Sequence, residues 1–271
     1  MIRIKTKKEI EILKEGGREL SSILASLAKM AKPGVSTADL EREALKMIKD
    51  FGGRPAFKDL EMFNDVYFPS ALCTSINNEV VHAPAIPGRI LKNGDVLKID
   101  IGMEYPLNKE PRNKYSKLGG YYTDMARTVI VGEASSEIKK FVKTTKECLE
   151  LGIKQVKPGN NLNDIGRAIQ THAEKNGYSV VREMVGHGVG HEVHEAPQVP
   201  HYEVKDGSME IYTLKPGMVI AIEPMLNMGS WEIESADDNF TFITKDGSLS
   251  AQFEHTIAVT EDGHIQITYD V

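Results

Sequence analysis

Apolar positions at helical spacing predict two helices in the N-terminal part of the chain. They recur on one side of residues 10–30, and Thr6 with Glu9 forms the capping-box pattern that begins a helix. A Lys-Pro-Gly turn at 32–34 ends this helix, and a second helical pattern follows over 37–50. We therefore expect a pair of amphipathic helices here.

The same pattern returns in the second half of the chain. A helical run over 141–156 is followed by another Lys-Pro-Gly turn at 157–159, and a further helical run over 164–177. Residues 91–96 (Leu-Lys-Asn-Gly-Asp-Val) are echoed by 214–219 (Leu-Lys-Pro-Gly-Met-Val), at nearly the same offset along the chain. Two matches in the same order favour an internal duplication over chance.

Segments rich in Val, Ile and Thr, which favour strands, follow each pair of helices. The predicted strands are 95–102, 121–131, 218–222 and 252–259. Because no Pro-, Gly- or Ser-rich linker separates the repeats, we expect one α+β domain over 1–271. Its two halves, roughly 1–135 and 136–271, are expected to share a sheet.

Composition narrows the class of protein. Apolar residues make up 41% and charged residues 27% of the 271 positions, which excludes a disordered or fibrous chain. The net charge of −6 argues against a general nucleic-acid binder, which needs a basic surface. No apolar run approaches the ~18 residues of a membrane span, and Cys73 and Cys148 are too few for a disulfide framework. These features are typical of a soluble protein of the reducing cytosol.

One segment does not fit the repeat. Residues 106–120 lie between two predicted strands and carry the basic residues Lys109, Arg112, Lys114 and Lys117. A solvated loop is the commoner explanation for such a segment, and a lid over a binding site is the alternative.

Four carboxylates fall at corresponding places in the two halves. The repeat aligns Asp100 with Glu223, each at the end of an apolar strand, and Asp124 and Glu254 add one further acid to each half. Four converging carboxylates repel one another, whereas two divalent cations would balance their charge. Taken singly, the simpler explanations are that Asp124 pairs with Arg127 and that Glu254 is a surface acid. The matched set of four favours a metal site.

Three histidines stand in suggestive surroundings. His82 precedes Ala-Pro, His187 lies within Gly-His-Gly-Val-Gly, and His194 precedes Glu-Ala-Pro. The glycines beside His187 permit close approach to a bound ion, and they equally suit a tight turn. The spacing of His187 and His191 is that of a zinc-binding pair on a helix, but these glycines disfavour a helix. The sequence has neither a Gly-x-Ser-x-Gly nucleophile turn nor a Walker A loop.

The order Asp, Asp, His, Glu, Glu, with a glutamate in Ile-Glu-Pro-Met, resembles the metallo-aminopeptidases of the pita-bread fold. The similarity is greatest to the type I methionine aminopeptidases and runs over nearly the whole chain, including segments 73–82, 186–197 and 250–256. It implies an α+β fold in which two pseudo-symmetric helix-helix-strand halves share a curved, mainly antiparallel sheet. The helices are expected outside.

The resemblance also implies a set of metal ligands. By this similarity, Asp100, Asp124, His187, Glu223 and Glu254 hold two divalent ions, with Asp124 and Glu254 bridging both. One histidine and four carboxylates form a hard, oxygen-rich donor set, which suits Mn, Fe(II) or Co, with Zn as a further possibility.

Catalytic roles follow from the same resemblance. Glu223 is expected to act as general base toward a metal-activated water or hydroxide. His82 and His194 are expected to bind the scissile amide and to stabilise the tetrahedral intermediate.

The resemblance places Phe68, Cys73 and Phe240 in the pocket for a methionine side chain. Phe240 stands where many relatives have Trp, and Val193 stands where some have an aromatic residue. The segment between the two aspartates is about a dozen residues longer than in compact members, and the extra length falls in the basic loop.

The implied function is removal of the initiator methionine from nascent or newly made proteins and peptides with a small second residue. The expected enzyme is cytoplasmic and monomeric, with a transient ribosome contact but no membrane or specific nucleic-acid partner. One alternative is a proline-directed peptidase such as aminopeptidase P or prolidase, which usually has a large extra N-terminal domain. The other is a non-catalytic scaffold that binds RNA or ribosomes, which is expected to have lost metal ligands.

Overall fold

The computed structural model describes residues 2–108 and 119–271. Most of the basic loop at 106–120 therefore lies outside the described residues. Among the described residues, no helix combines the length and the apolar character that crossing a membrane requires.

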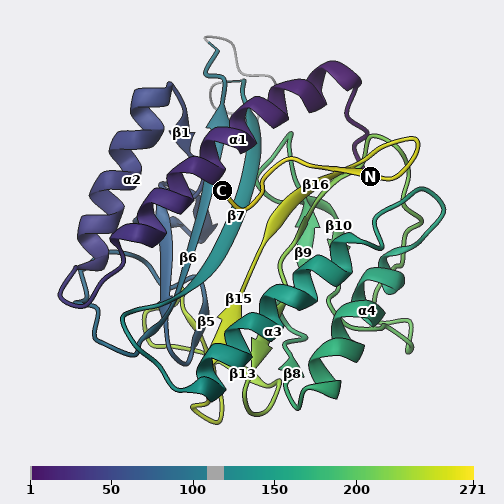
Figure 1. Ribbon diagram of the computed structural model, residues 1–271. Helices are drawn as coiled ribbons and strands as arrows, with labels where there is room; N and C mark the ends of the chain where they lie inside the picture. The colour runs from purple at the N-terminus through teal and green to yellow at the C-terminus, as the bar shows by residue number, and fades with distance from the viewer. Residues whose placement is uncertain (1, 109–118) are drawn as a thin grey trace.

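In the described part of the chain, four α-helices form two pairs, as the repeat predicts (Figure 1). They are α1 (Lys7–Met30), α2 (Thr37–Phe51), α3 (Ser136–Ile153) and α4 (Leu162–Lys175). The predicted capping box of Thr6 and Glu9 is present at the start of α1. The predicted start of the third helix at 141 is wrong. It begins earlier because the Ser135 side chain accepts a hydrogen bond from the Ile138 N–H at 3.2 Å.

The second helix of each pair begins in the same way. Ser36 with Asp39 forms the capping box of α2, and Asn161 with Asp164 forms that of α4. The glycine of each Lys-Pro-Gly turn has a left-handed backbone, with φ of 90° at Gly34 and 88° at Gly159. Turn and cap are therefore repeated together, as an internal duplication requires.

The strands pair antiparallel in several hydrogen-bonded sheets. The sheet of the N-terminal half contains β1 (Arg54–Pro55), β4 (Leu72–Ile76), β6 (Val96–Tyr105) and β7 (Tyr121–Ile130). That of the C-terminal half contains β10 (Glu195–Val199), β9 (Gly186–Gly188), β11 (Val219–Ile222), β16 (His255–Val259) and β17 (His264–Gln266). Smaller sheets contain β15 (Ser250–Gln252), β12 (Met225–Asn227) and β8 (Ser179–Val180); β13 (Ile233–Ser235), β14 (Phe242–Thr244) and β5 (Glu79–Val81); and β2 (Glu61–Phe63) with β3 (Val66–Tyr67).

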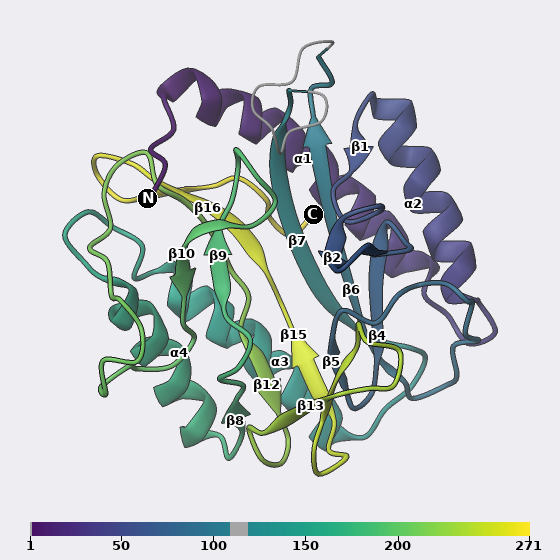
Figure 2. The same cartoon turned by 180° about the vertical axis from the view of Figure 1, so that it is seen from behind.

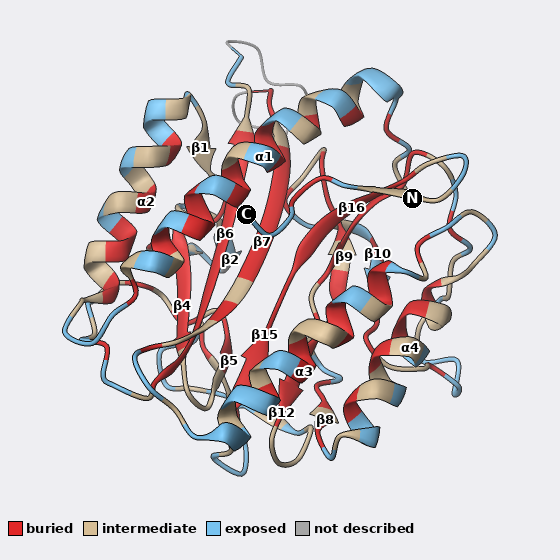
Figure 3. Ribbon diagram, viewed as in Figure 1, coloured by how far each residue is buried: buried red, intermediate tan, exposed pale blue. Residues whose placement is uncertain are grey.

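The helices cover one face of the strands, and the opposite face carries the short strands and loops (Figure 2). Each half has an apolar core between its helix pair and its strands, so the strands that lie behind the helices are almost entirely buried (Figure 3). A third apolar cluster takes residues from both halves, among them Phe68 and Cys73 from one and Val193 and Val219 from the other. The α+β class is therefore confirmed, with the helices outside.

The two halves meet where β7 lies beside β15 and β16. The Thr128 hydroxyl donates to the Gln252 carbonyl at 2.6 Å and accepts from the Gln252 N–H at 2.9 Å. The Thr256 hydroxyl likewise donates to the Asp124 carbonyl at 2.8 Å and accepts from the Asp124 N–H at 3.0 Å. Two threonine side chains thus join the backbones of the two halves along this seam, which we call the threonine seam.

A buried ion pair fastens the segment before α1 to the C-terminal half. The Lys5 ammonium pairs with Glu195, and 1% and 3% of the two side chains are exposed. Burial lowers the pKa of Lys5, and the attraction of Glu195 opposes that shift. Because Glu195 follows His194 in the chain, this pair also restrains the segment that holds a predicted substrate residue.

Replacing Lys5 with Met is expected to lower the free energy of unfolding by about 3 kcal/mol, because Glu195 would lose its buried partner. This loss lies at the low end of the range for a broken buried ion pair, because Arg3 remains 3.7 Å from the other Glu195 oxygen and can partly replace Lys5. Lys14→Met is the matched control. It removes an exposed pair with Glu11 and should change the same quantity by less than ~1 kcal/mol. Urea unfolding measures both, and equal losses would contradict the assignment.

Candidate metal centre

The five predicted metal ligands lie together at the junction of the two halves. All five line one cavity, together with His82 and His194. The ligands are Asp100 in β6, Asp124 in β7, His187 in β9, Glu223 directly after β11 and Glu254 between β15 and β16. The structure therefore brings the five predicted ligands together at one place.

Two details of the strands differ from the prediction. Asp100 does not end its strand, because β6 continues to Tyr105 through pairing with β7. The predicted strand 252–259 is two strands, interrupted at Phe253 and Glu254. Within the interruption the Glu254 N–H donates to the Ala126 carbonyl at 2.9 Å. This bond holds the Glu254 backbone against β7.

The potential ligand atoms form overlapping groups. Asp100, Asp124 and Glu254 have oxygens within 4.8 Å of one another, and so do the ligand atoms of His187, Glu223 and Glu254. His187 Nε2 lies 3.5 Å from Glu223 Oε1 and 4.0 Å from Asp124 Oδ2. Glu254 belongs to both groups, and Asp124 also groups with His187 and His194.

Neither of the simpler explanations for these acids holds. Arg127 pairs with Asp270 and is not among the groups that act on the pKa of Asp124, so it does not neutralise that acid. Glu254 is 2% exposed, so it is not a surface acid. Moreover, no lysine or arginine is among the residues that line the cavity in the described part of the chain. The carboxylates must therefore be neutralised by protons or by bound cations.

Burial raises the pKa of all four of these acids, and the charges of neighbouring carboxylates raise three of them further. Burial raises the pKa of Asp100 to about 7. Burial first, and then the neighbouring carboxylates, raise the pKa values of Asp124, Glu223 and Glu254 well above the usual range. One oxygen of Asp100 and one of Glu254 are buried without a hydrogen-bond partner. Hard oxygen donors that lack other partners fit divalent cations.

His187 is held in the tautomer that a metal ligand needs. Its Nδ1 lies 2.9 Å from the Gly188 carbonyl, which can only accept, so Nδ1 carries the proton. The unprotonated Nε2 then faces Glu223 and Asp124. Burial lowers the pKa of His187 well below its ordinary value, so the ring is neutral. The glycines on either side let the neighbouring strands pack closely against β9, because a Cβ at Gly188 would lie 2.3 Å from the Ala196 carbonyl oxygen and one at Gly186 would lie 2.4 Å from the Ala221 carbonyl oxygen.

Glu223 is oriented by two residues that the sequence analysis did not single out. The Gln252 amide donates to Glu223 Oε2 at 3.1 Å, and the Glu223 N–H donates to His201 Nε2 at 3.1 Å. Gln252 stands two residues before Glu254, within the segment 250–256 that carries part of the family resemblance. The sequence could therefore have identified Gln252 as a site residue. His201 is fully buried, but no spacing connects it to the other ligands.

The predicted substrate histidines flank the ligands. The rings of His187 and His194 stand edge to face with centroids 4.5 Å apart. His82 follows β5, and its ring contacts Phe242 at 5.8 Å between centroids. Burial lowers the pKa of His82 to about 4, so this imidazole is neutral near pH 7.

One wall of the cavity is apolar. Phe68 and Cys73, both predicted, line it together with Phe57, Leu60 and Met62, which the sequence analysis missed. The predicted residue Phe240 is not in this lining. Its ring meets Phe68 edge to face at 5.5 Å and faces a neighbouring cavity. Burial and the nearby carboxylates raise the pKa of the Cys73 thiol, which keeps it uncharged and suited to an apolar wall.

Binding of Mn²⁺ by the metal-free protein at pH 7 is expected to release protons. Carboxylates whose pKa is raised hold protons that must leave before they can ligate, so the apparent affinity should fall from pH 8 to pH 6. Calorimetric titration in two buffers of different ionisation enthalpy measures the released protons.

Asp124→Asn should weaken Mn²⁺ binding at least about tenfold, whereas the control Asp270→Asn, which changes an acid outside the cavity, should not. Binding independent of pH would contradict the assignment.

Comparisons with known proteins agree with this geometry. The sequence pattern of metallopeptidase family M24 matches residues 11–261. Methionine aminopeptidase A of Synechocystis sp. is 45% identical over 262 residues, which cover 97% of this chain and 95% of that protein. Methionine aminopeptidase 1 of Bacillus subtilis is 44% identical over 264 residues, which cover 97% of both proteins.

Solved structures show the same fold. The methionine aminopeptidase from Thermotoga maritima superposes with a TM-score of 0.88 at 39% identity, and the match covers 100% of both chains. The prolidase from Pyrococcus horikoshii superposes with a TM-score of 0.73 at 21% identity, and only 64% of that chain is covered. The second likeness concerns the fold alone. The predicted pita-bread fold is thus confirmed, and the chain belongs to metallopeptidase family M24.

Proposed function

We propose that this chain is a methionine aminopeptidase, which removes the N-terminal methionine from newly made proteins and peptides with a small second residue. The observation that carries the proposal is the set of one histidine and four buried carboxylates beside an apolar wall. Relatives that are 44–45% identical over nearly their whole length have this name. A proline-directed activity has weaker support, since the prolidase is only 21% identical.

The ligands are proposed to hold two divalent ions. Asp100, Asp124 and Glu254 would hold one ion, and His187, Glu223 and Glu254 the other, with Asp124 also reaching the second. This oxygen-rich set suits Mn, Fe(II) or Co, with Zn as a further candidate. When bound, such ions polarise a carbonyl group and lower the pKa of a water molecule.

The side chains of the chain supply proton transfer and orientation. Glu223 is proposed to accept the proton of the attacking water, and the Gln252 amide, which donates to Glu223 Oε2, holds that carboxylate in place. His82 and His194 are proposed to hydrogen-bond the scissile amide and the oxygen on which negative charge develops. A neutral His82 donates one N–H without adding a positive charge that would repel the ions.

The apolar wall is proposed to bind the methionine side chain. Phe57, Leu60, Met62, Phe68 and Cys73 offer the soft, adaptable surface that a thioether needs. Phe240 would support this pocket through its edge-to-face contact with Phe68. Because the wall adjoins the ligands, the first residue of a peptide can fill it while its α-amine faces the carboxylates.

Other expectations belong to the same proposal. We propose a cytoplasmic enzyme that acts as a monomer on nascent chains, with a transient ribosome contact. The chain is proposed to be one domain over 1–271, with halves of roughly 1–135 and 136–271. The antiparallel threonine seam and the apolar cluster shared by both halves support a single folding unit.

Metal-dependent removal of methionine tests the activity. After chelation and dialysis, addition of Mn²⁺, Co²⁺ or Fe²⁺ is expected to restore cleavage of Met-Ala-Ser and to leave Met-Leu-Ser nearly uncleaved, because a bulky second residue is excluded. Released methionine is measured by chromatography. Activity that is unaffected by chelation, or equal rates on both peptides, would refute the proposal.

His194→Ala is expected to lower kcat by about 10²–10³-fold, the usual cost of removing one donor to a developing oxyanion. Metal content should remain intact, because His194 acts on the substrate. The control His172→Ala removes a surface histidine that contacts Glu147 on the neighbouring helix and should leave kcat unchanged. Metal content is measured by elemental analysis, and loss of metal in His194→Ala would show that its role is misassigned.

A further inference from the structure

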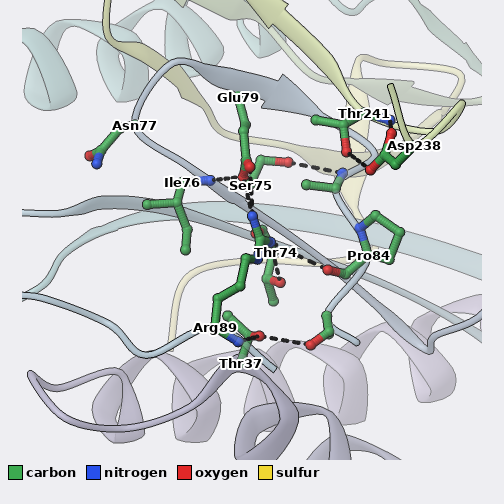
Figure 4. Close-up of polar contacts among 12 residues, drawn as sticks. Thr37, Thr74, Ser75, Ile76, Asn77, Glu79, Pro84, Arg89, Asp238 and Thr241 are labelled. Atoms are coloured by element: carbon green, nitrogen blue, oxygen red, sulfur yellow. Dashed lines mark hydrogen bonds and ion pairs between the residues drawn. The ribbon is translucent and has the colours of Figure 1, made fainter. Parts of the chain in front are cut away.

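Arg89 joins the two sides of the turn that carries His82. It lies between β5 and β6, and its guanidinium extends back to the β4–β5 hairpin (Figure 4). Nη1 pairs with both oxygens of Glu79 at 2.6 and 2.7 Å, and Nη2 donates to the Pro84 carbonyl at 3.3 Å. Nη2 also donates to the Thr74 carbonyl on β4. Glu79 precedes His82 and Pro84 follows it, so one side chain holds both flanks.

The turn between these flanks requires such support. His82 has a φ of 62°, in the left-handed region that a residue with a Cβ rarely adopts. A strained backbone of this kind persists only where the surrounding contacts fix it. Without them, the turn can relax to a right-handed or extended backbone, and the imidazole would then leave its place beside the metal ligands.

Arg89 is itself fixed to the helical layer. Its N–H donates to the Thr37 hydroxyl at 3.0 Å, and its carbonyl accepts from the Thr37 N–H at 2.9 Å. Thr37 is the first residue of α2 and is fully buried. The guanidinium therefore connects a rigid helix start to the hairpin. Glu79 completes the arrangement, since it also accepts from the Ile76 N–H at 2.6 Å.

We infer that Arg89 is a positioning residue for His82. It acts through the backbone on either side of that histidine and does not itself line the cavity of the metal ligands. The inference rests on the proposed function, in which His82 hydrogen-bonds the scissile amide. A positioning residue of this kind affects the chemical step and not the binding of metal.

The test compares Arg89→Met, His82→Ala and the double variant, all loaded with Mn²⁺, in the cleavage of Met-Ala-Ser. Arg89→Met should lower kcat by about 10- to 100-fold with little change in KM, since small misplacements of a reacting group have effects of this size. In the His82→Ala background the same change should cost less than about twofold, because the residue that it positions is already absent. An equal loss in both backgrounds, or none in either, overturns the inference.

Two further variants guard against a general loss of structure. Arg167→Met removes a surface arginine that also pairs with two carboxylates, Asp164 and Glu203, and should leave kcat unchanged. Arg89→Lys should recover only part of the rate, because an ammonium lacks the planar fork that reaches both flanks. If Arg89→Met does not fold, Glu79→Gln replaces it and is expected to show the same dependence on His82.

A readout without substrate separates this inference from the proposed function. The imidazole NMR signals of His82 are assigned as those lost in His82→Ala. They should shift or broaden in Arg89→Met and stay unchanged in Arg167→Met. If the wild-type protein does not cleave Met-Ala-Ser, the proposed function fails, and shifted signals still support the positioning role. Unchanged signals in Arg89→Met overturn it.

Discussion

The mutual repulsion of four buried carboxylates is the constraint on which the rest of this structure depends. Asp100 and Asp124 come from one half, and Glu223 and Glu254 come from the other. Burial disfavours the charge of all four, and the charges of Asp100 and Glu223 further raise the pKa values of Asp124 and Glu254. Divalent ions would remove this penalty and would tie the two halves together through shared ligands. The same interaction thus connects the stability of the folded chain with its proposed chemistry.

The backbone at the junction is arranged for this convergence. Along the threonine seam, hydroxyls of Thr128 and Thr256 join the backbones of the two halves on both sides of the Glu254–Ala126 contact. A continuous strand pair would alternate its side chains regularly between two faces. The interruption at Glu254 departs from that alternation, and it occurs at the residue that belongs to both ligand groups. The irregularity of the sheet is therefore part of the site.

The repeat made much of this arrangement predictable. Helix caps and turns depend on local sequence, so a few residues were enough to predict each helix. The duplication in turn predicted that Asp100 and Glu223 occupy corresponding positions. The short strands could not be found, because two or three residues have no measurable periodicity. Contacts such as Gln252 with Glu223 and Phe240 with Phe68 depend on where distant segments meet. The same reason explains why Phe57, Leu60 and Met62 were missed in the pocket.

The position of charge explains why a free amino terminus suits this site. The net charge of −6 belongs to the whole chain, whereas the cavity combines acids with neutral histidines and, among its described lining residues, no cationic side chain. His187 and His82 have lowered pKa values, so they add no positive charge near pH 7. Every compensating cation must then enter from outside. A metal ion can do so, and the α-amine of a peptide can join it as a ligand or as a cation. An internal peptide bond offers no such group, so the electrostatics of the cavity favour an exopeptidase.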